Sequence, residues 1–135
     1  MAAAAVVVFL LSALLLPGIQ SFENKFHPIE MKVENSVDNT QPLLFNTTVV
    51  TDGILLGAMR RLQNANAGFT FTTKDDLNFG PLLESVNGLF GSTENHTYWK
   101  ILVKTPQGEP VRLDVGVGCF LPKAQDQIIF QYTTW

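Results

Sequence analysis

Residues 51–62, with the sequence TDGILLGAMRRL, contain the strongest helix signal in this chain of 135 residues. Apolar side chains recur here at the spacing of one helical face, at Ile54, Leu55, Ala58, Met59 and Leu62. Thr51 or Asp52 could cap the first turn, because a side-chain oxygen there can accept from a free backbone N–H. Asn66 and Gly68 are typical of residues that end a helix. We therefore predict one amphipathic helix over this stretch.

Strand-like segments flank the helix on both sides. Residues 29–34 alternate apolar and polar side chains, which is typical of a half-buried strand. Further β-rich segments are 43–50, 69–73, 82–89, 97–105, 111–117 and 127–135. We expect 82–89 and 97–105 to pair as antiparallel neighbours, because only a short loop joins them. Several strands around a single helix predict an α+β fold with a mostly antiparallel sheet.

The N-terminal segment differs from the rest of the chain. Residues 1–16 carry no charged side chain, and Ser12 is their one polar residue. The apolar run 2–16 would be about 22 Å long as a helix, which is short for a bilayer core that needs about 20 apolar residues. We therefore predict a cleavable signal peptide, 1–21, with cleavage after Ser21 and Gly18 as the alternative site. The protein is then secreted and keeps no membrane attachment; an uncleaved anchor is the alternative.

The charge of the chain argues against one class of partner. Nine Lys and Arg against twelve Asp and Glu give a net charge of −3, and the largest basic cluster is the pair Arg60-Arg61. Phosphate binding needs clustered positive charge, so we predict no nucleic-acid partner. Two sequons, at Asn46 and Asn95, predict N-glycosylation at the surface and agree with secretion.

Catalytic and metal-binding residues are scarce. His27 precedes a proline and His96 lies inside a sequon, which are positions typical of solvated loop histidines. Asp75-Asp76 is a weak candidate for a metal-ligand pair, because adjacent acids in a polar segment are usually solvated. Cys119 would need a base and a lowered pKa to act as a nucleophile, and nothing nearby in the sequence supplies them. We therefore predict that the chain is not an enzyme and ligates no metal.

Two positions leave alternatives open. Cys119 is the sole cysteine, and we expect a buried thiol because free cysteines are among the most buried residues. An intermolecular disulfide is the alternative. Tyr98-Trp99, next to Lys100, offers aromatic area with polar groups for a ligand. The alternative is that Trp99 is simply a core residue, because one face of its strand must pack inward.

Several motifs follow one another in an order that a bare sheet core does not require. They are the leucine-rich helix at 55–62, Phe69-Thr70-Phe71, Phe79-Gly80-Pro81, Ser85-Val86-Asn87-Gly88, Glu94-Asn95-His96-Thr97-Tyr98-Trp99, and Gly116-Val117 with Pro122. In this order they resemble the C-terminal β-domain of the cobalamin carrier family, which comprises transcobalamin, intrinsic factor and haptocorrin. The likeness spans about residues 41–135 and ends on an aromatic residue, Trp135.

The resemblance implies a secreted protein that binds or transports cobalamin (vitamin B12). In those carriers a helical barrel domain and the β-domain clamp the corrin, and the β-domain covers one face of the ring. The positions that match the contacting segments are Phe79, Gly80, Pro81, Leu82, Trp99, Lys100, Ile101 and Leu102. Cobalamin or a related corrinoid is therefore the expected ligand, and a separate helical-domain partner or a cell-surface receptor is an expected further partner.

Three segments are expected in the chain: the signal peptide at 1–21, a leader with the first strand at 22–42, and the carrier-like β-domain at 43–135. Residues 22–42 are too few for a helical barrel. The segment 116–120 reads GVGCF and lacks the Asp that the carriers have there. Both departures predict weak cobalamin binding by this chain alone. The alternative function is a secreted glycoprotein interaction or signalling module that kept the fold and lost the ligand.

Overall fold

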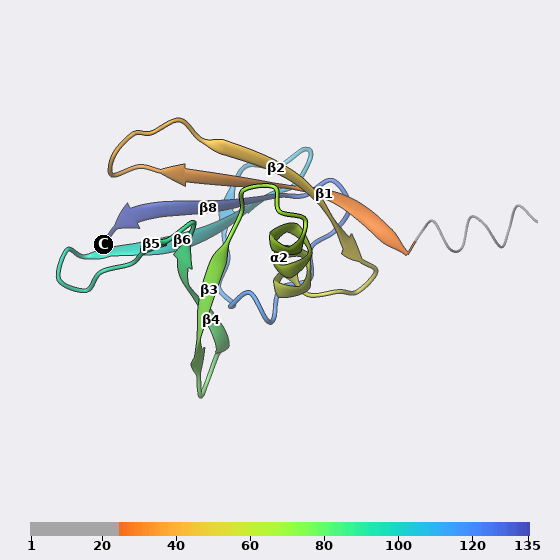
Figure 1. Cartoon of the computed structure of the whole chain (residues 1–135). Helices are drawn as coiled ribbons and strands as arrows, with labels where there is room; N and C mark the ends of the chain where they lie inside the picture. The colour runs from red at the N-terminus through yellow and green to blue at the C-terminus, as the bar shows by residue number, and fades with distance from the viewer. Residues whose placement is uncertain (1–24) are drawn as a thin grey trace, which may run out of the picture.

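The computed structural model describes residues 25–135, which form one helix and two β-sheets (Figure 1). The larger sheet has the strand order β2-β1-β8-β6-β7. Its strands are β1 (Phe26–Asn35), β2 (Leu43–Val50), β6 (Thr97–Lys104), β7 (Val111–Arg112) and β8 (Gln127–Thr134). The smaller sheet has the strand order β3-β4-β5, with β3 (Phe71–Asp76), β4 (Gly80–Val86) and β5 (Leu89–Phe90). The helix is α2 (Leu55–Asn64). The predicted signal peptide lies outside the described residues.

The strand pairing confirms the predicted α+β class with mostly antiparallel sheets. β1 runs antiparallel to β2 but parallel to β8, with Glu30 opposite Gln127 and Asn35 opposite Tyr132. The other pairings of the named strands are antiparallel. β1 therefore lies inside the larger sheet, between its sequence neighbour β2 and the C-terminal strand β8.

The core lies between α2 and one face of the larger sheet. Met31 of β1 and Phe130 of β8 face it with 0% exposure. The ring centroid of Phe69, which precedes β3, lies 5.6 Å from that of Phe45 and 5.8 Å from that of Phe130. The helix adds Leu55, Leu56, Ala58, Met59 and Leu62. Full burial of a large apolar side chain stabilises a fold by roughly 1.5–3 kcal/mol, so this cluster holds the chain together without an internal disulfide.

The start of α2 differs from the prediction. Neither Thr51 nor Asp52 caps the helix, so that prediction is wrong. The backbone N–H groups of the first two helical residues donate instead to the carbonyl oxygens of Phe120 and Val117, at 2.8 and 3.0 Å. The loop between β7 and β8 thus satisfies donors that have no partner within the helix. A partner more than 60 positions away cannot be recognised from the local sequence.

β4 pairs with β3 and β5 rather than with β6, so the predicted pairing of 82–89 with 97–105 is wrong. The physical reason is the pair Asn87-Gly88, whose positive φ angles of 49° and 81° turn the chain back inside the predicted segment. β5 then pairs with the end of β4, and β6 joins the larger sheet between β8 and β7. The predicted strand 111–117 is also too long, because β7 has only two residues.

Side-chain hydrogen bonds join the two sheets. Trp99 Nε1 on β6 donates to the carbonyl oxygen of Leu89 at 2.8 Å. The Tyr132 hydroxyl on β8 donates to the carbonyl oxygen of Phe90 at 2.9 Å and lies 2.8 Å from Thr97 Oγ1. The ring centroids of Trp99 and Tyr132 are 5.1 Å apart. Aromatic side chains, rather than a strand ladder, therefore hold β5 against the larger sheet.

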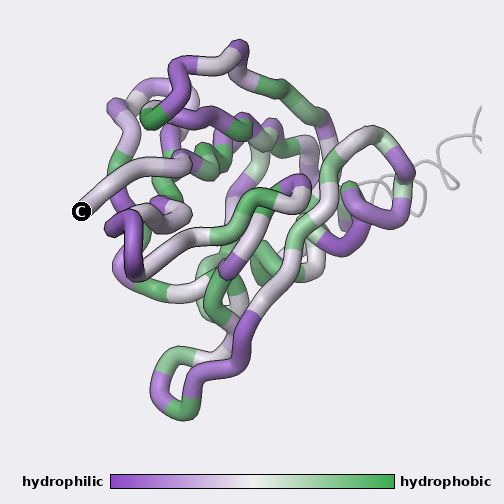
Figure 2. Tube along the Cα trace, turned by 60° about the vertical axis from the view of Figure 1, so that its left-hand side comes forward, coloured by the Kyte–Doolittle hydropathy of each residue, from purple (hydrophilic) through white to green (hydrophobic). Residues whose placement is uncertain are grey.

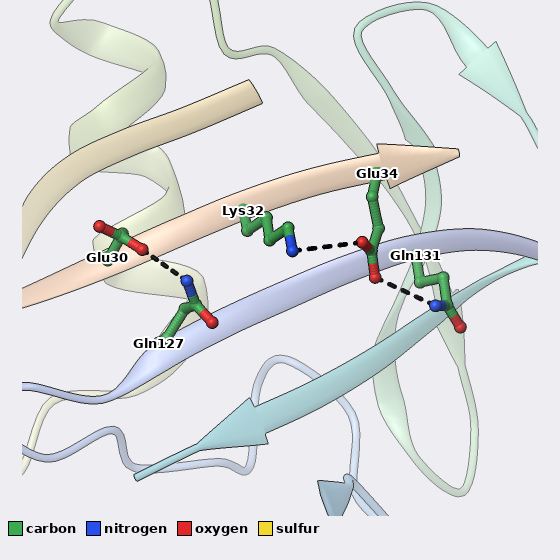
Figure 3. Close-up of polar contacts among 5 residues, drawn as sticks. All are labelled: Glu30, Lys32, Glu34, Gln127 and Gln131. Carbon is green, nitrogen blue, oxygen red and sulfur yellow. Dashed lines mark hydrogen bonds and ion pairs between the residues drawn. The ribbon is translucent and has the colours of Figure 1, made fainter. Parts of the chain in front are cut away.

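Polar cross-strand pairs lie on the outer face of the larger sheet, away from the core (Figure 3). Gln127 Nε2 donates to Glu30 Oε1 at 2.5 Å, and Gln131 Nε2 donates to Glu34 Oε1 at 3.0 Å. Lys32 Nζ lies 3.5 Å from Glu34 Oε2. The two glutamine–glutamate hydrogen bonds link β1 and β8 in addition to the backbone pairing, and the Lys32–Glu34 ion pair lies within β1.

The β3–β4 hairpin extends away from the larger sheet (Figures 1 and 2). At its tip Asp76 Oδ1 accepts from the backbone N–H groups of Asn78 at 2.8 Å and Phe79 at 3.0 Å, which stabilises a tight turn. Leu77 is fully exposed and Phe79 is 59% exposed. The hairpin therefore presents apolar surface outside the core.

Candidate functional site

A cavity of about 360 Å³ opens where the base of the hairpin, the edge of β6 and the loop after β7 meet. The hairpin lines it with Phe79, Leu82 and Leu83, β6 with residues 98–101, and β7 with its following loop with residues 112–117. Most of these side chains are apolar, and the charged ones are Lys100, Arg112 and Asp114. An apolar wall with a few polar groups is the usual composition of a small-molecule site.

The predicted binding residues come together only in part. Those that line the cavity are Phe79, Leu82, Trp99, Lys100 and Ile101. Three others, Gly80, Pro81 and Leu102, do not line it. Leu102 lies on the outer face of the sheet, away from the core, where it is the strand partner of Ile129 on β8 and Arg112 on β7. The two predicted segments therefore meet across a cavity, and not through the antiparallel pairing that their sequence positions suggested.

The side chain and the peptide group of Trp99 have different environments. The indole is 8% exposed, packs against Tyr132 and donates its N–H to β5, so it is part of the core cluster. This is the packing alternative for Trp99, and it means that the indole contributes to the fold. What Trp99 can offer a ligand is mainly its backbone.

The edge of β6 is open at Trp99. Thr97 exchanges backbone hydrogen bonds with Ser92 at 2.9 and 3.0 Å, and the Ile101 carbonyl accepts from the N–H of Leu113 at 2.9 Å. Both contacts lie on the side of β6 away from β8. Peptide groups two residues apart point to the same side of a strand, so the N–H and C=O of Trp99 point there too. Within the described part of the chain they have no backbone partner on that side, and they lie at the cavity.

The loop after β7 is the part of the site that the binding-residue prediction missed. Gly116 and Gly118 let this loop approach the hairpin closely, because a Cβ on either would lie 3.1 Å from an atom of Pro81. Pro81, which does not line the cavity, therefore contacts the loop that forms one of the cavity walls. The available signal was the Gly116-Val117-Gly118 spacing, since glycines in a loop often mark close backbone approach.

Positive side chains lie at the rim of the cavity. Lys100 follows Trp99 on β6, and successive side chains of a strand point to opposite faces. Because the Trp99 side chain faces the core, the Lys100 side chain lies on the outer face of the sheet, opposite Gln131. The guanidinium carbon of Arg112 lies 5.8 Å from the ring centroid of Tyr98. Lysine and arginine are donors without acceptors, so the rim is suited to carbonyl or carboxylate oxygens.

Cys119 is exposed, so the prediction of a buried thiol is wrong. It lies in the loop between β7 and β8, where its backbone N–H donates to the Gly116 carbonyl at 3.0 Å and turns the chain. Its neighbours take the inward positions instead: Val117 is completely buried and Phe120 packs against the core. Burial at this point of the loop alternates, and the cysteine occupies an outward position.

The remaining candidate residues lie apart from the cavity. His27 Nε2 is 2.9 Å from Thr51 Oγ1 and His96 packs edge-on against Trp135, with 5.1 Å between ring centroids. Among residues 25–135 no group of three or more His, Cys, Asp or Glu side chains could hold a metal ion. In the same part of the chain no helix is long and apolar enough to cross a membrane. Asn46 and Asn95, the sequon residues, are both exposed.

Two curated proteins with cobalamin in their names are similar in sequence to this chain. Human transcobalamin-1 is 24% identical over 105 residues, which cover 78% of this chain and 23% of that protein. The canine cobalamin binding intrinsic factor is 32% identical over 98 residues, which cover 69% of this chain and 22% of that protein. This chain therefore spans about a quarter of the length of the curated relatives it matches. No protein-family model matches it.

Solved structures share the fold. Haptocorrin in complex with Cbi superimposes with a TM-score of 0.68 and 21% identity, over 83% of this chain and 26% of that one. A protein from Ruminococcus gnavus, described as a putative metal binding protein, gives a TM-score of 0.56 and 16% identity over 81% of this chain and 98% of that one. The second match covers nearly the whole of the solved chain.

Proposed function

We propose, on the premise that this chain corresponds to the C-terminal β-domain of the cobalamin carrier family, that it is a secreted glycoprotein that binds cobalamin or a related corrinoid. The ligand would lie at the cavity between the hairpin base and β6, with one face of the corrin against the chain. The protein would act by binding and transport, not by catalysis. A separate helical-domain partner would cover the opposite face of the ring.

The open edge of β6 is the observation that carries this proposal. A corrin has an apolar ring and amide side chains at its periphery. The unpaired N–H and C=O of Trp99 could bind one amide by a pair of hydrogen bonds, in the way that an added strand would. Phe79 and Leu82, on the hairpin side of the cavity, would contact the apolar ring edge. Lys100 at the rim could donate to a second amide oxygen.

The size of the cavity supports weak binding by this chain alone. Its volume of about 360 Å³ is near the lower end of the roughly 300–1,000 Å³ of sites for drug-sized ligands. It would hold an edge of the corrin with one or two side chains rather than the whole macrocycle. Much of the ligand surface would stay exposed until a second protein covers it.

Titration of the purified secreted protein with cyanocobalamin tests the proposal. We expect measurable binding in equilibrium dialysis and tighter binding when a helical-domain fragment of a cobalamin carrier is present. Lys100→Glu should weaken binding by about tenfold or more, because a hydrogen bond to a charged group contributes about 1.5–3 kcal/mol. Lys104→Glu is the matched control, because Lys104 lies on the same strand and face but outside this cavity.

Two results would contradict the proposal. The first is an absence of binding at high cyanocobalamin concentration, both with and without the helical fragment. The second is an equal loss of binding in Lys100→Glu and Lys104→Glu, which would indicate a general effect of charge on the sheet. Thermal unfolding of both variants should match that of the parent, since both lysines are only half-buried on the outer face and a surface charge contributes little to stability.

A second function, a protein-interaction module, is favoured by one observation. Leu77 at the hairpin tip is fully exposed and lies outside the cavity, so corrin binding gives it no role. An exposed apolar side chain on a projecting hairpin could contact a partner protein or a cell-surface receptor. Leu77→Ser should then reduce binding of the labelled protein to cells while leaving cyanocobalamin titration unchanged. Equal cell binding by both proteins would contradict this second function.

A further inference from the structure

β2 is an edge strand, and half of its peptide groups point away from the sheet. Pairing with β1 places Phe45 opposite Met31 and Asn46 opposite Glu30. The Glu30 N–H donates to Asp126, next to β8, so Glu30 directs its peptide groups away from β2. The peptide groups of Asn46 therefore also point away from the β1–β2 ladder, because opposite residues in an antiparallel pair are bonded together or not at all.

The two ends of this free edge are different. Near the helix the edge is covered: the Thr48 carbonyl accepts from Arg61 Nη1 at 3.0 Å and the Val50 carbonyl accepts from the Gly53 N–H at 2.7 Å. At the other end, Leu44 and Asn46 have no partner for their outward N–H and C=O groups in the described chain. The open part of the edge therefore starts at Leu44 and is centred near Asn46.

This open edge lacks the usual protection against pairing with another strand. Edge strands are commonly protected by charged residues, prolines or bulges, but β2 reads LLFNTTVV and contains no charge and no proline. Its register with β1 is continuous, without a bulge. Leu43 is 46% and Leu44 is 61% exposed. A short apolar, β-prone segment without charge is the type of sequence that associates with copies of itself.

The sequon is the one feature in β2 that could prevent this association. Asn46 is exposed and its side chain makes no hydrogen bond in the described chain, so its amide is accessible to a glycan. We propose that a glycan on Asn46 covers the open edge of β2 and prevents the chain from pairing with a second copy through this strand. This inference does not depend on cobalamin binding.

The expected register explains why position 46 is suited to this role. An antiparallel pair of β2 strands centred on Phe45 would place Leu44 of each copy opposite Asn46 of the other. Each of those pairs would exchange N–H and C=O groups that are free in the single chain. Side chains opposite each other lie about 4.5–5.5 Å apart, so a glycan on Asn46 would occupy the space needed by Leu44 of the second copy.

The test compares two variants at one position. Thr48→Ala removes the sequon without changing Asn46, and Thr48→Ser keeps it. Both proteins are secreted from a glycosylating cell line, kept in a reducing buffer so that Cys119 cannot crosslink them, and studied by light scattering after size-exclusion chromatography. We expect parent and Thr48→Ser to be monomers carrying a glycan on Asn46 by peptide mass spectrometry. Thr48→Ala should have about twice the monomer mass or more.

Two further variants separate edge pairing from other causes. Asn95→Gln removes the second sequon and should leave the protein monomeric, because Asn95 lies in the turn before β6. Thr48→Ala combined with Leu44→Lys should return to a monomer, because a charge then lies on the open edge. A monomeric Thr48→Ala protein, or a parent protein without a glycan on Asn46, would overturn the proposal. A double variant that stays associated would also overturn it.

Discussion

The two sheets differ in what surrounds their strands. The larger sheet packs one face on α2 and the aromatic core, and its other face carries polar cross-strand pairs. The smaller sheet has few fully buried residues, among them Ser85 and Val86, and its hairpin carries apolar side chains into solvent. Stability should therefore come mainly from the larger sheet, while both sheets carry exposed apolar side chains, such as Leu44 on β2 and Phe90 on β5.

The candidate site lies at the junction between these two regions. Trp99 and Tyr132 reach from the larger sheet to carbonyl oxygens of β5, and the cavity opens beside them. Because no strand ladder crosses this junction, the Trp99 peptide group is left open. The cavity and the missing ladder therefore have one origin: the sheets meet through side chains.

Substitution of a core aromatic should have the largest effect and would test where stability resides. Phe130→Ala should lower the free energy of unfolding by about 3–5 kcal/mol, because Phe130 is completely buried and the cavity left behind would refill only in part. Phe79→Ala on the hairpin is the matched control and should change it by less than about 1 kcal/mol, because Phe79 is 59% exposed. Urea denaturation measures both. Similar losses would show that the hairpin is part of the core after all.

Loss of one hydroxyl at the junction should have an intermediate effect. Tyr132→Phe keeps the ring but leaves the Phe90 carbonyl without its donor, and should cost about 1–3 kcal/mol. Tyr98→Phe is the control on the neighbouring strand and should cost less than about 0.5 kcal/mol, because Tyr98 lies on the outer face. Hydrogen exchange of the β5 amides should increase in Tyr132→Phe only. Unchanged exchange would mean that the hydroxyl does not join the sheets.

Two glycines should respond to alanine with opposite signs. Gly116→Ala should destabilise the protein by about 1 kcal/mol, because its Cβ would lie 3.1 Å from the Pro81 carbonyl oxygen and the loop must shift. Gly57→Ala should stabilise it by about 0.5–1 kcal/mol, because Gly57 is in α2 with nothing within 4 Å of an added Cβ. Thermal unfolding reports both signs. A stabilising Gly116→Ala would contradict the close approach of the loop to the hairpin.

Prediction from the sequence was accurate for the strands and the helix whose own residues determine their structure. β2 occupies 43–50 as predicted, and β6 and β8 each end one residue earlier than predicted. α2 starts at Leu55, inside the predicted segment 51–62, and ends two residues after it at Asn64; its apolar face has the expected 3.6-residue period. The fold class followed from these elements.

Prediction failed where distant segments decide the structure. The helix is capped by carbonyl oxygens of the loop before β8, and the strand pairing is set by the turn at Asn87-Gly88 and by the aromatic junction. Five of eight predicted binding residues line the cavity because the resemblance marked two segments, but the 112–117 wall comes from a loop that only the tertiary fold brings there. The open peptide group of Trp99 has no signal in the sequence, since it depends on where β7 ends.

Cys119 should give the smallest effect on stability and the clearest test of the loop between β7 and β8, which contacts the hairpin of the smaller sheet. The side chain is exposed, while Val117 and Phe120 on either side face the core. A maleimide reagent should therefore label the folded, reduced protein as fast as it labels the urea-unfolded chain, within about tenfold, because access is not limited by unfolding.

Cys119→Ser should change the free energy of unfolding by less than about 0.5 kcal/mol, since the Cys119 contact that positions the loop is a backbone hydrogen bond to Gly116. Without reductant, the parent but not Cys119→Ser should form some disulfide-linked dimer on a non-reducing gel. Labelling that appears only above the urea midpoint would show that this loop packs with the thiol inward. Residues 112–117 would then not form the cavity wall in the way described.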